Sequence, residues 1–174
     1  MKAALDARTD ALLESRAAAL AARSADRARA VETTGYLVCA CGPERYGLPL
    51  ASIAGVMPER PCTALPGAPA ALRGICAMAG TIVSVLDLSA CLGLATGSGE
   101  GHLVRLRGQE VAVALGVDRV LGIARIEAVP ADPAEVLGGG PLLGYVPPAS
   151  DRTGDVRDGF TILDLPALLA RFLT

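Results

Sequence analysis

The feature that most constrains the fold of this chain is an abrupt change of sequence texture near Gly35. Residues 2–31 contain neither glycine nor proline, and leucine recurs there at helical spacing, which predicts a single helix. After Gly35, short runs of Val, Ile and Leu alternate with glycine and proline, as is typical of short strands joined by tight turns. We therefore expect an N-terminal helical extension over residues 1–33 and a β-rich body over residues 34–174.

Within the body, apolar runs bounded by turn residues predict the individual strands. The expected strands are residues 36–41 and 45–50, paired as a first hairpin, residues 53–57 and 80–86, residues 102–107 and 110–116, paired as a second hairpin, and residues 117–129 and 160–163. Arginine alternates with valine and leucine over residues 102–107, which predicts a sheet with one exposed face. Asp87 and Asp164 each follow an apolar run and are expected to cap short helices, the second of them running through Phe172. The glycine-rich residues 95–101 are expected to divide the strands into two groups.

Composition limits the kinds of partner that this chain can have. The formal charge is −2, no dense basic stripe is present, and aromatic residues make up only 3% of the chain, with no tryptophan. Nucleic-acid binding needs basic surfaces or aromatic stacking platforms, so neither nucleic acid nor an anionic membrane surface is an expected partner. No apolar run approaches the roughly 20 residues of a membrane-spanning helix, so direct membrane insertion is not expected either.

Cysteine usage and the N-terminal residues bear on the cellular compartment. The chain contains five cysteines, an odd number that argues against a complete disulfide framework. Its first residues mix acidic and basic side chains and lack the apolar core of an export signal. We expect the protein to be cytoplasmic, where thiols stay reduced.

The residues that carry most enzymatic chemistry are sparse and poorly combined. A serine or cysteine nucleophile needs a base, and His102 is the only histidine. Cys39 and Cys41 fall on one face of a predicted strand without further metal ligands, so they are expected to act as small apolar residues. The strand-end carboxylates are expected to cap turns or helices. These observations predict no enzyme, no bound metal and no cofactor.

An ordered series of short motifs supports a resemblance to a known family. The motifs are Tyr36-Leu37-Val38, Tyr46-Gly47-Leu48-Pro49-Leu50, Leu65-Pro66-Gly67-Ala68-Pro69, Arg73-Gly74-Ile75, the run from Gly80 to Leu88, Val117-Asp118-Arg119-Val120 and the run from Gly159 to Leu165. Each motif alone is common, but their order over residues 36–169 resembles the CheW-like family of chemotaxis coupling proteins.

The resemblance implies both a fold and a function. Its fold is all-β, with two small five-stranded β-barrel subdomains packed together, here with an N-terminal helix and a short C-terminal helix added. Family members bridge the regulatory domain of a CheA-type histidine kinase to the cytoplasmic tip of chemoreceptors, the methyl-accepting chemotaxis proteins, and they have no catalytic activity. The expected function is therefore that of a non-enzymatic adaptor in a two-component signalling system.

Two departures from the family pattern affect the expected partner-binding groove. Family members usually carry Asn-Leu-Arg-Gly where this chain has Ala77-Met78-Ala79-Gly80, and a Glu where this chain has Gly55. An Arg and a Glu that flank one groove can pair, and losing both together is easier to tolerate than losing one. The result is a more apolar groove. Its predicted partner-binding residues are Ile53, Val56, Met57, Ala77, Met78, Ala79 and Gly80.

Three alternatives to this adaptor function stay open at this stage. A divergent accessory member of the family could bind the kinase or other array components without binding receptors, as the absence of the Glu and Arg suggests. A small-barrel metal-binding or enzymatic domain is an alternative from another class, and it rests on the five cysteines. The N-terminal helix could also mediate self-association.

Overall fold

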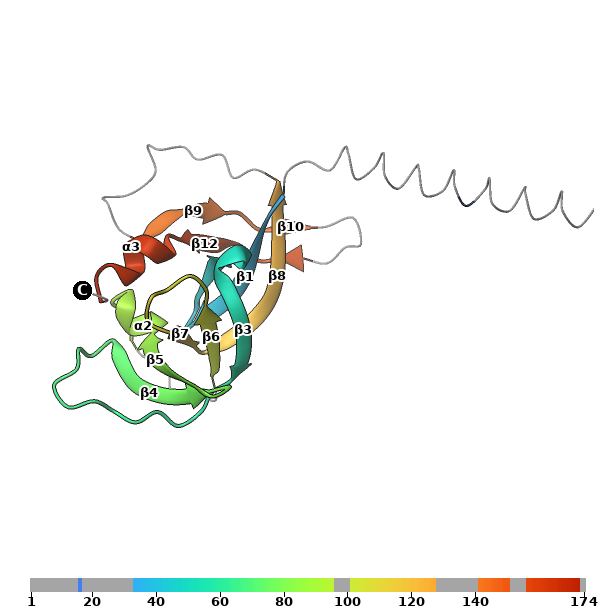
Figure 1. Ribbon diagram of the computed structural model, residues 1–174. Coiled ribbons are helices and arrows are strands. Elements are labelled where there is room, and N and C mark those ends of the chain that lie inside the picture. Colours follow the sequence, from blue (N-terminus) through green and yellow to red (C-terminus); the bar gives the residue numbers. More distant parts are fainter. Residues whose placement is uncertain (1–15, 17–32, 96–100, 128–140, 151–155, 173–174) are drawn as a thin grey trace, which may run out of the picture. The chain divides into compact units, whose positions relative to one another are not determined.

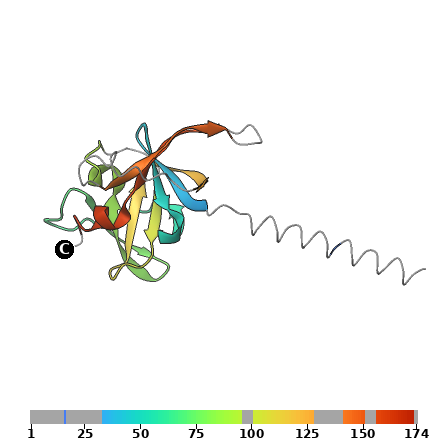
Figure 2. The same cartoon turned by 90° about the horizontal axis from the view of Figure 1, so that it is seen from above.

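The computed structural model describes residues 16, 33–95, 101–127, 141–150 and 156–172. The predicted N-terminal helix, apart from Arg16, and most of the predicted connector at residues 95–101 lie outside the described residues, and the domain boundary after residue 33 stays a prediction. The described body consists mostly of strands, arranged in two curved five-stranded sheets that Figures 1 and 2 show from two directions. This confirms the predicted all-β class.

The first sheet combines the beginning and the end of the body. Its strand order is β8-β1-β2-β12-β9. The strands are β1 (Thr33–Cys41), β2 (Glu44–Pro49), β8 (Arg119–Glu127), β9 (Leu142–Val146) and β12 (Phe160–Leu163). The predicted first hairpin is confirmed, since β1 and β2 pair antiparallel from Tyr36 opposite Pro49 to Cys41 opposite Glu44. Asp118 supports the turn of this hairpin, because its Oδ2 accepts a 2.6 Å hydrogen bond from the backbone N–H of Gly42.

The second sheet contains the central part of the chain in the order β3-β6-β7-β5-β4. The strands are β3 (Ile53–Pro58), β4 (Leu72–Met78), β5 (Thr81–Asp87), β6 (His102–Leu106) and β7 (Val113–Val117). Strand β5 pairs parallel with β7, whereas β3–β6, β6–β7 and β4–β5 are antiparallel. The segment after β3 reaches β4 through one isolated bridge between Thr63 and Ile75. The second sheet is therefore not a closed barrel.

Short elements complete the fold, and the predicted caps are among them. They are η1 (Leu50–Ser52), α2 (Leu88–Cys91), α3 (Leu165–Leu169) and the small pair β10 (Ala149–Ser150) and β11 (Val156–Arg157). Asp87 Oδ1 accepts the N–H of Ala90 at 2.9 Å, and Asp164 Oδ1 accepts the N–H of Ala167 at 3.0 Å. Both aspartates are thus N-caps, as predicted. The α-helical part of α3 ends at Leu169 and not at Phe172.

The sorting of strands into sheets differs from the prediction. The sequence suggested one group before residues 95–101 and one after, but β6 and β7 join β3–β5, while β8, β9 and β12 join β1 and β2. The predicted alternation over residues 102–107 holds for Val104 and Leu106, which are buried, and for Arg107, which is exposed, but Arg105 is only half-buried. Strand β7 is buried along its whole length, and Leu103 and Val104 of β6 pack into two different clusters. Central strands covered on both faces lose the alternation of an exposed sheet.

Three apolar clusters explain how the sheets hold together. The largest draws on both sheets and on α2 and α3, with Leu48, Leu88, Leu115 and Leu168 fully buried in it. Each sheet also has a smaller cluster of its own. In the first sheet it is Tyr36, Val38, Ala124, Val146, Phe160 and Ile162, and in the second it is Cys76, Met78, Val83, Val85, Leu103 and Ala114. Each sheet therefore curves around its own core, and a shared core joins the two.

Candidate partner-binding surface

The seven predicted partner-binding residues lie on β3 and around the β4–β5 turn. In the strand order of the second sheet, β6, β7 and β5 separate β3 from β4. Ile53 is 7% exposed and belongs to the shared core, while Met78 is fully buried in the core of the second sheet. Neither side chain is therefore open to a partner in this structure, and the partner-binding role of the seven residues stays a prediction. Alternation along a strand turns one side chain inward and the next outward, and these two point inward.

The other predicted residues keep surface that a partner could contact. Val56 is 40% exposed, Met57 is half-buried, and Ala77, Ala79 and Gly80 are exposed. The register of β4 and β5 adds a residue that the sequence interpretation missed, because Ile82 lies directly opposite Ala77 and is 70% exposed. Because Ile82 lies in an apolar run, the sequence suggested that its side chain is buried. Side chains alternate between the two faces of a strand, so the buried Val83 and Val85 place Ile82 on the opposite face, and this alternation is the signal that could have identified it as exposed.

The two departures from the family pattern fall where a longer side chain has room. A Cβ placed on Gly55 would meet nothing within 4 Å. Ala79 and Gly80 form the two-residue turn between β4 and β5, with φ of 49° and 79°. Positive φ at both positions is the geometry of a type I′ hairpin turn, which presents residue 79 to solvent. Packing therefore does not require a small residue at position 55 or at position 79.

A second exposed apolar surface lies on β8, the edge strand of the first sheet. Leu121 is 44% exposed and Ile123 is 60% exposed, and they alternate with residues that turn toward the core such as Ala124. Arg119 and Arg125 are exposed at the two ends of the same row. Exposed apolar side chains rimmed by charge are a usual composition for a protein-binding surface. The sequence indicated a strand here but not which of its residues are exposed.

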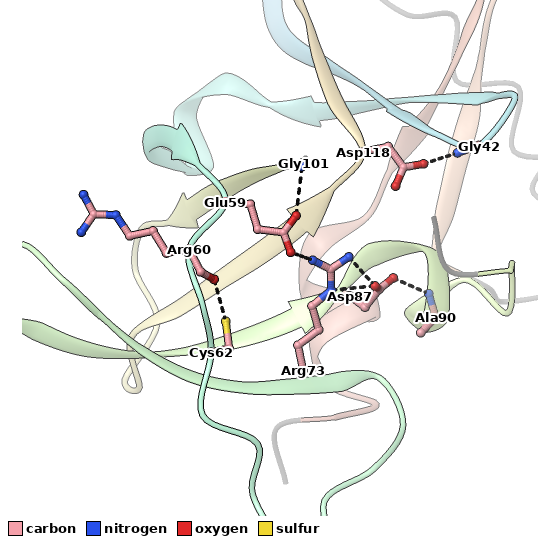
Figure 3. Close-up of polar contacts among 9 residues, drawn as sticks. All are labelled: Gly42, Glu59, Arg60, Cys62, Arg73, Asp87, Ala90, Gly101 and Asp118. Atoms are coloured by element: carbon pink, nitrogen blue, oxygen red, sulfur yellow. Dashed lines mark hydrogen bonds and ion pairs between the residues drawn. The ribbon is translucent and has the colours of Figure 1, made fainter. Parts of the chain in front are cut away.

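A network of charged side chains lies between β4, β5 and the segment that follows β3 (Figure 3). The Arg73 guanidinium donates from Nε to Asp87 Oδ2 at 2.8 Å, and its second nitrogen lies 2.7 Å from the same oxygen. Its third nitrogen donates to Glu59 Oε1 at 2.5 Å, and Glu59 Oε2 accepts the backbone N–H of Gly101 at 3.0 Å. Sequence reasoning identified the Asp87 cap but missed this network, because its members are far apart in the chain.

Burial and charge act in opposite directions on Arg73. Desolvation lowers the pKa of its guanidinium, but the hydrogen bonds and charges of Asp87 and Glu59 outweigh it, and the net pKa is raised. Arg73 therefore stays protonated. The Asp87 side chain is only 5% exposed, against 22% for Arg73 and 31% for Glu59. The network thus neutralises a carboxylate that is almost withdrawn from water.

An open hollow of about 500 Å³ adjoins this network. It is lined by Pro58, Glu59, Arg60, Pro61, Cys62, Arg73 and Gly101. None of the seven predicted partner-binding residues lines it. Its walls come from the end of β3 and the proline-containing segment that follows it, together with Arg73 and Gly101.

No group of side chains suited to a metal ion is assembled in the described part of the chain. Among these residues, no three His, Cys, Asp or Glu side chains come together as a metal site requires. The Nδ1 atom of His102 is buried and has no hydrogen-bond partner among the described groups. No helix within the described segments is long and apolar enough to cross a membrane.

Two curved five-stranded β-sheets around a shared apolar core, with exposed apolar side chains on β3, β5 and β8, define a domain of the all-β class. The sequence pattern of the CheW-like domain family matches residues 35–172, and the chain belongs to that family. This confirms the resemblance seen in the motifs.

Comparison with known proteins finds similar solved structures but no curated relative. The scaffolding protein TtCheW from Thermoanaerobacter tengcongensis has a similar fold, with a TM-score of 0.62 at 20% sequence identity. The similarity covers 76% of this chain and 90% of that chain. No curated protein matches the sequence significantly.

Proposed function

We propose that this protein is a non-enzymatic cytoplasmic adaptor that couples chemoreceptors to a CheA-type histidine kinase. The observation that carries the proposal is the family match over residues 35–172, which includes both sheets and the shared core. The kinase would be held through its regulatory domain and the receptor through its cytoplasmic tip. The adaptor contributes geometry, since holding both partners in one assembly lets receptor conformation bias the kinase through differential contacts.

Exposed apolar residues can supply the binding free energy for contacts with the kinase and the receptor. Protein interfaces gain most of their free energy from a few anchors in a desolvated centre. Val56 on β3, Ile82 on β5 and Ile123 on β8 are candidates, because each is at least 40% exposed although it belongs to a strand of the folded core. A receptor helix hairpin would lay its apolar face across such residues.

The first prediction concerns binding by the purified full chain. We expect it to bind a CheA-type regulatory domain and, separately, a receptor cytoplasmic fragment, as measured by calorimetry or surface plasmon resonance. Ile82→Asp and Ile123→Asp, each tested against both partners, should weaken one of the two interactions at least tenfold, because a charge replaces an apolar anchor. Arg45→Ala is the control, because Arg45 lies on β2 outside these rows and its side chain is 40% exposed. Absence of binding to both partners would refute the adaptor proposal.

A second candidate function is that of an accessory member that binds the kinase but not receptors. The specific observation in its favour is the open space at Gly55 and the exposed turn position of Ala79, where the family usually carries Glu and Arg. Under this alternative the natural chain binds only the kinase domain, and the double variant G55E/A79R gains receptor binding. Tight receptor binding by the natural chain, unchanged in the double variant, would eliminate this alternative.

A further inference from the structure

The isolated bridge between Thr63 and Ile75 fixes the position of two cysteines. Thr63 donates its N–H to Ile75 at 2.8 Å, and Ile75 donates back to Thr63 at 2.9 Å, with the two backbones antiparallel. A pair that exchanges both bonds is a hydrogen-bonded pair, so its neighbours on either side are non-hydrogen-bonded pairs. One of these neighbours is Cys62 opposite Cys76.

The side chains of these two cysteines lie on the same face and touch the same cluster. Cys76 is 7% exposed and belongs to the core of the second sheet, and half-buried Cys62 packs against that core. Burial raises the pKa of the Cys62 thiol, and the charge and hydrogen bonding of the Cys76 thiol raise it further. Both thiols are free, and the Cys62 Sγ donates to the Arg60 carbonyl at 3.5 Å.

Two cysteines that face each other in this way are close enough to form a disulfide bond. Non-hydrogen-bonded antiparallel pairs have Cα atoms about 4.5 Å apart, at the short end of the range of about 4.4 to 6.8 Å found for disulfides. A bond at the edge of the allowed geometry is more easily reduced than a relaxed one, which suits reversible rather than permanent closure.

Solvent access to Cys62 distinguishes this pair from the other three cysteines. Cys62 lines the open hollow beside Arg73, so a small reagent can reach its sulfur. Cys39 and Cys41 are 0% and 1% exposed, and their partners across the β1–β2 hairpin are Tyr46 and Glu44. Burial raises the pKa of the Cys39 thiol to about 12 and that of Cys41 to about 11. Cys91 is 2% exposed in α2.

We propose that Cys62 and Cys76 form a reversible cross-strand disulfide that covalently joins the segment after β3 to β4. The oxidant is a small-molecule disulfide. The Cys62 thiolate attacks one of its sulfurs and releases one thiol, and Cys76, after losing its proton to water, attacks the resulting mixed disulfide at the Cys62 sulfur and releases the second. Two protein thiols are oxidised and one small disulfide is reduced to two thiols. Disulfides of this kind in reducing compartments are typically transient and redox-sensing.

The structural consequence is closure of the second sheet. In the reduced protein, the backbone bridge at Thr63 and Ile75 and the ion pair between Glu59 and Arg73 join the segment after β3 to β4. The disulfide would turn that bridge into a covalent link next to the Arg73 network. The disulfide closes a loop of 15 residues, from Cys62 to Cys76. Because this restricts the unfolded chain while both cysteines are already in place in the folded protein, we expect the melting temperature to rise by about 5 °C or more.

The experiment treats the reduced full chain with oxidised glutathione, alkylates the remaining thiols and maps tryptic peptides by mass spectrometry. Trypsin places Cys62 on residues 46–73 and Cys76 on residues 74–105, since the Arg60-Pro61 bond is resistant. We expect these two peptides to be linked, and fragmentation to locate the bond at Cys76 rather than Cys91. The peptide of residues 30–45, with Cys39 and Cys41, should stay fully alkylated.

Controls make the outcome decisive. Cys62→Ala should abolish the linked peptide and the rise in melting temperature, and dithiothreitol should reverse both in the natural chain. Oxidation in concentrated urea should give mixed pairings, because the register that selects Cys76 is lost. Full alkylation of both Cys62 and Cys76 after oxidation of the folded chain, or a bond to Cys91, would overturn the proposal.

Discussion

Replacing Arg73 with alanine is expected to lower the free energy of unfolding by about 3 kcal/mol or more, because it leaves a buried carboxylate without its cation. Asp87 is 3% exposed overall, and Arg73 supplies two of its contacts, at 2.8 and 2.7 Å. The same substitution releases Glu59, whose other bond holds the backbone of Gly101. Urea denaturation followed by circular dichroism measures the change.

The matched control is Arg45→Ala, which removes another arginine from an ion pair. Arg45 lies 2.7 Å from Asp158, but the two side chains are 40% and 57% exposed. Exposed ion pairs contribute about 0 to 1 kcal/mol, so this variant should unfold at nearly the natural urea concentration. Equal losses for the two variants would show that burial of Asp87 is not what makes the Arg73 contact important.

The features that could be predicted from the sequence are those set by neighbouring residues. The β1–β2 hairpin follows from two apolar runs around Gly42, whose φ of 58° suits a turn. The caps at Asp87 and Asp164 follow from an aspartate placed directly before a short helix, with its carboxylate within reach of the third residue beyond. Such local chemistry is readable without knowing the fold.

Sheet partners could not be predicted in the same way. Strand β8 returns to β1 across most of the chain, and β5 pairs parallel with β7 across α2 and the glycine-rich residues. An apolar run shows that a strand is buried but not against which neighbour. The family resemblance implied two subdomains, yet the sequence order of the strands suggested the wrong membership for β6 and β7.

The candidate surface was predicted only in part for a related reason. Ile53, Met78 and Ile82 are all large apolar residues in apolar segments, yet the first two are buried and the third is 70% exposed. Which side of a strand faces the core depends on register, and shifting the register by one residue reverses every side chain. The Cys62–Cys76 pairing depends on the same kind of information, since it follows from the bridge at Thr63 and Ile75.

The second large effect is expected for Gly74→Ala. Gly74 has φ of 140°, a conformation that residues with a Cβ rarely adopt, and a Cβ there would collide with the backbone carbonyl of Thr63. Backbone strain and overpacking each cost about 1 to 3 kcal/mol, so the combined loss should be about 3 kcal/mol. Thermal and urea denaturation measure it directly.

Gly55→Ala is the matched control, because Gly55 lies in β3 of the same sheet with nothing within 4 Å of the added Cβ. It should leave stability unchanged or raise it slightly, since alanine reduces the conformational freedom of the unfolded chain. The Gly74→Ala variant should also lose the linked Cys62–Cys76 peptide, because the Thr63 backbone must move away from β4. A Gly74→Ala protein with natural stability and a normal disulfide would mean that the Thr63–Ile75 bridge does not hold the edges of the second sheet together.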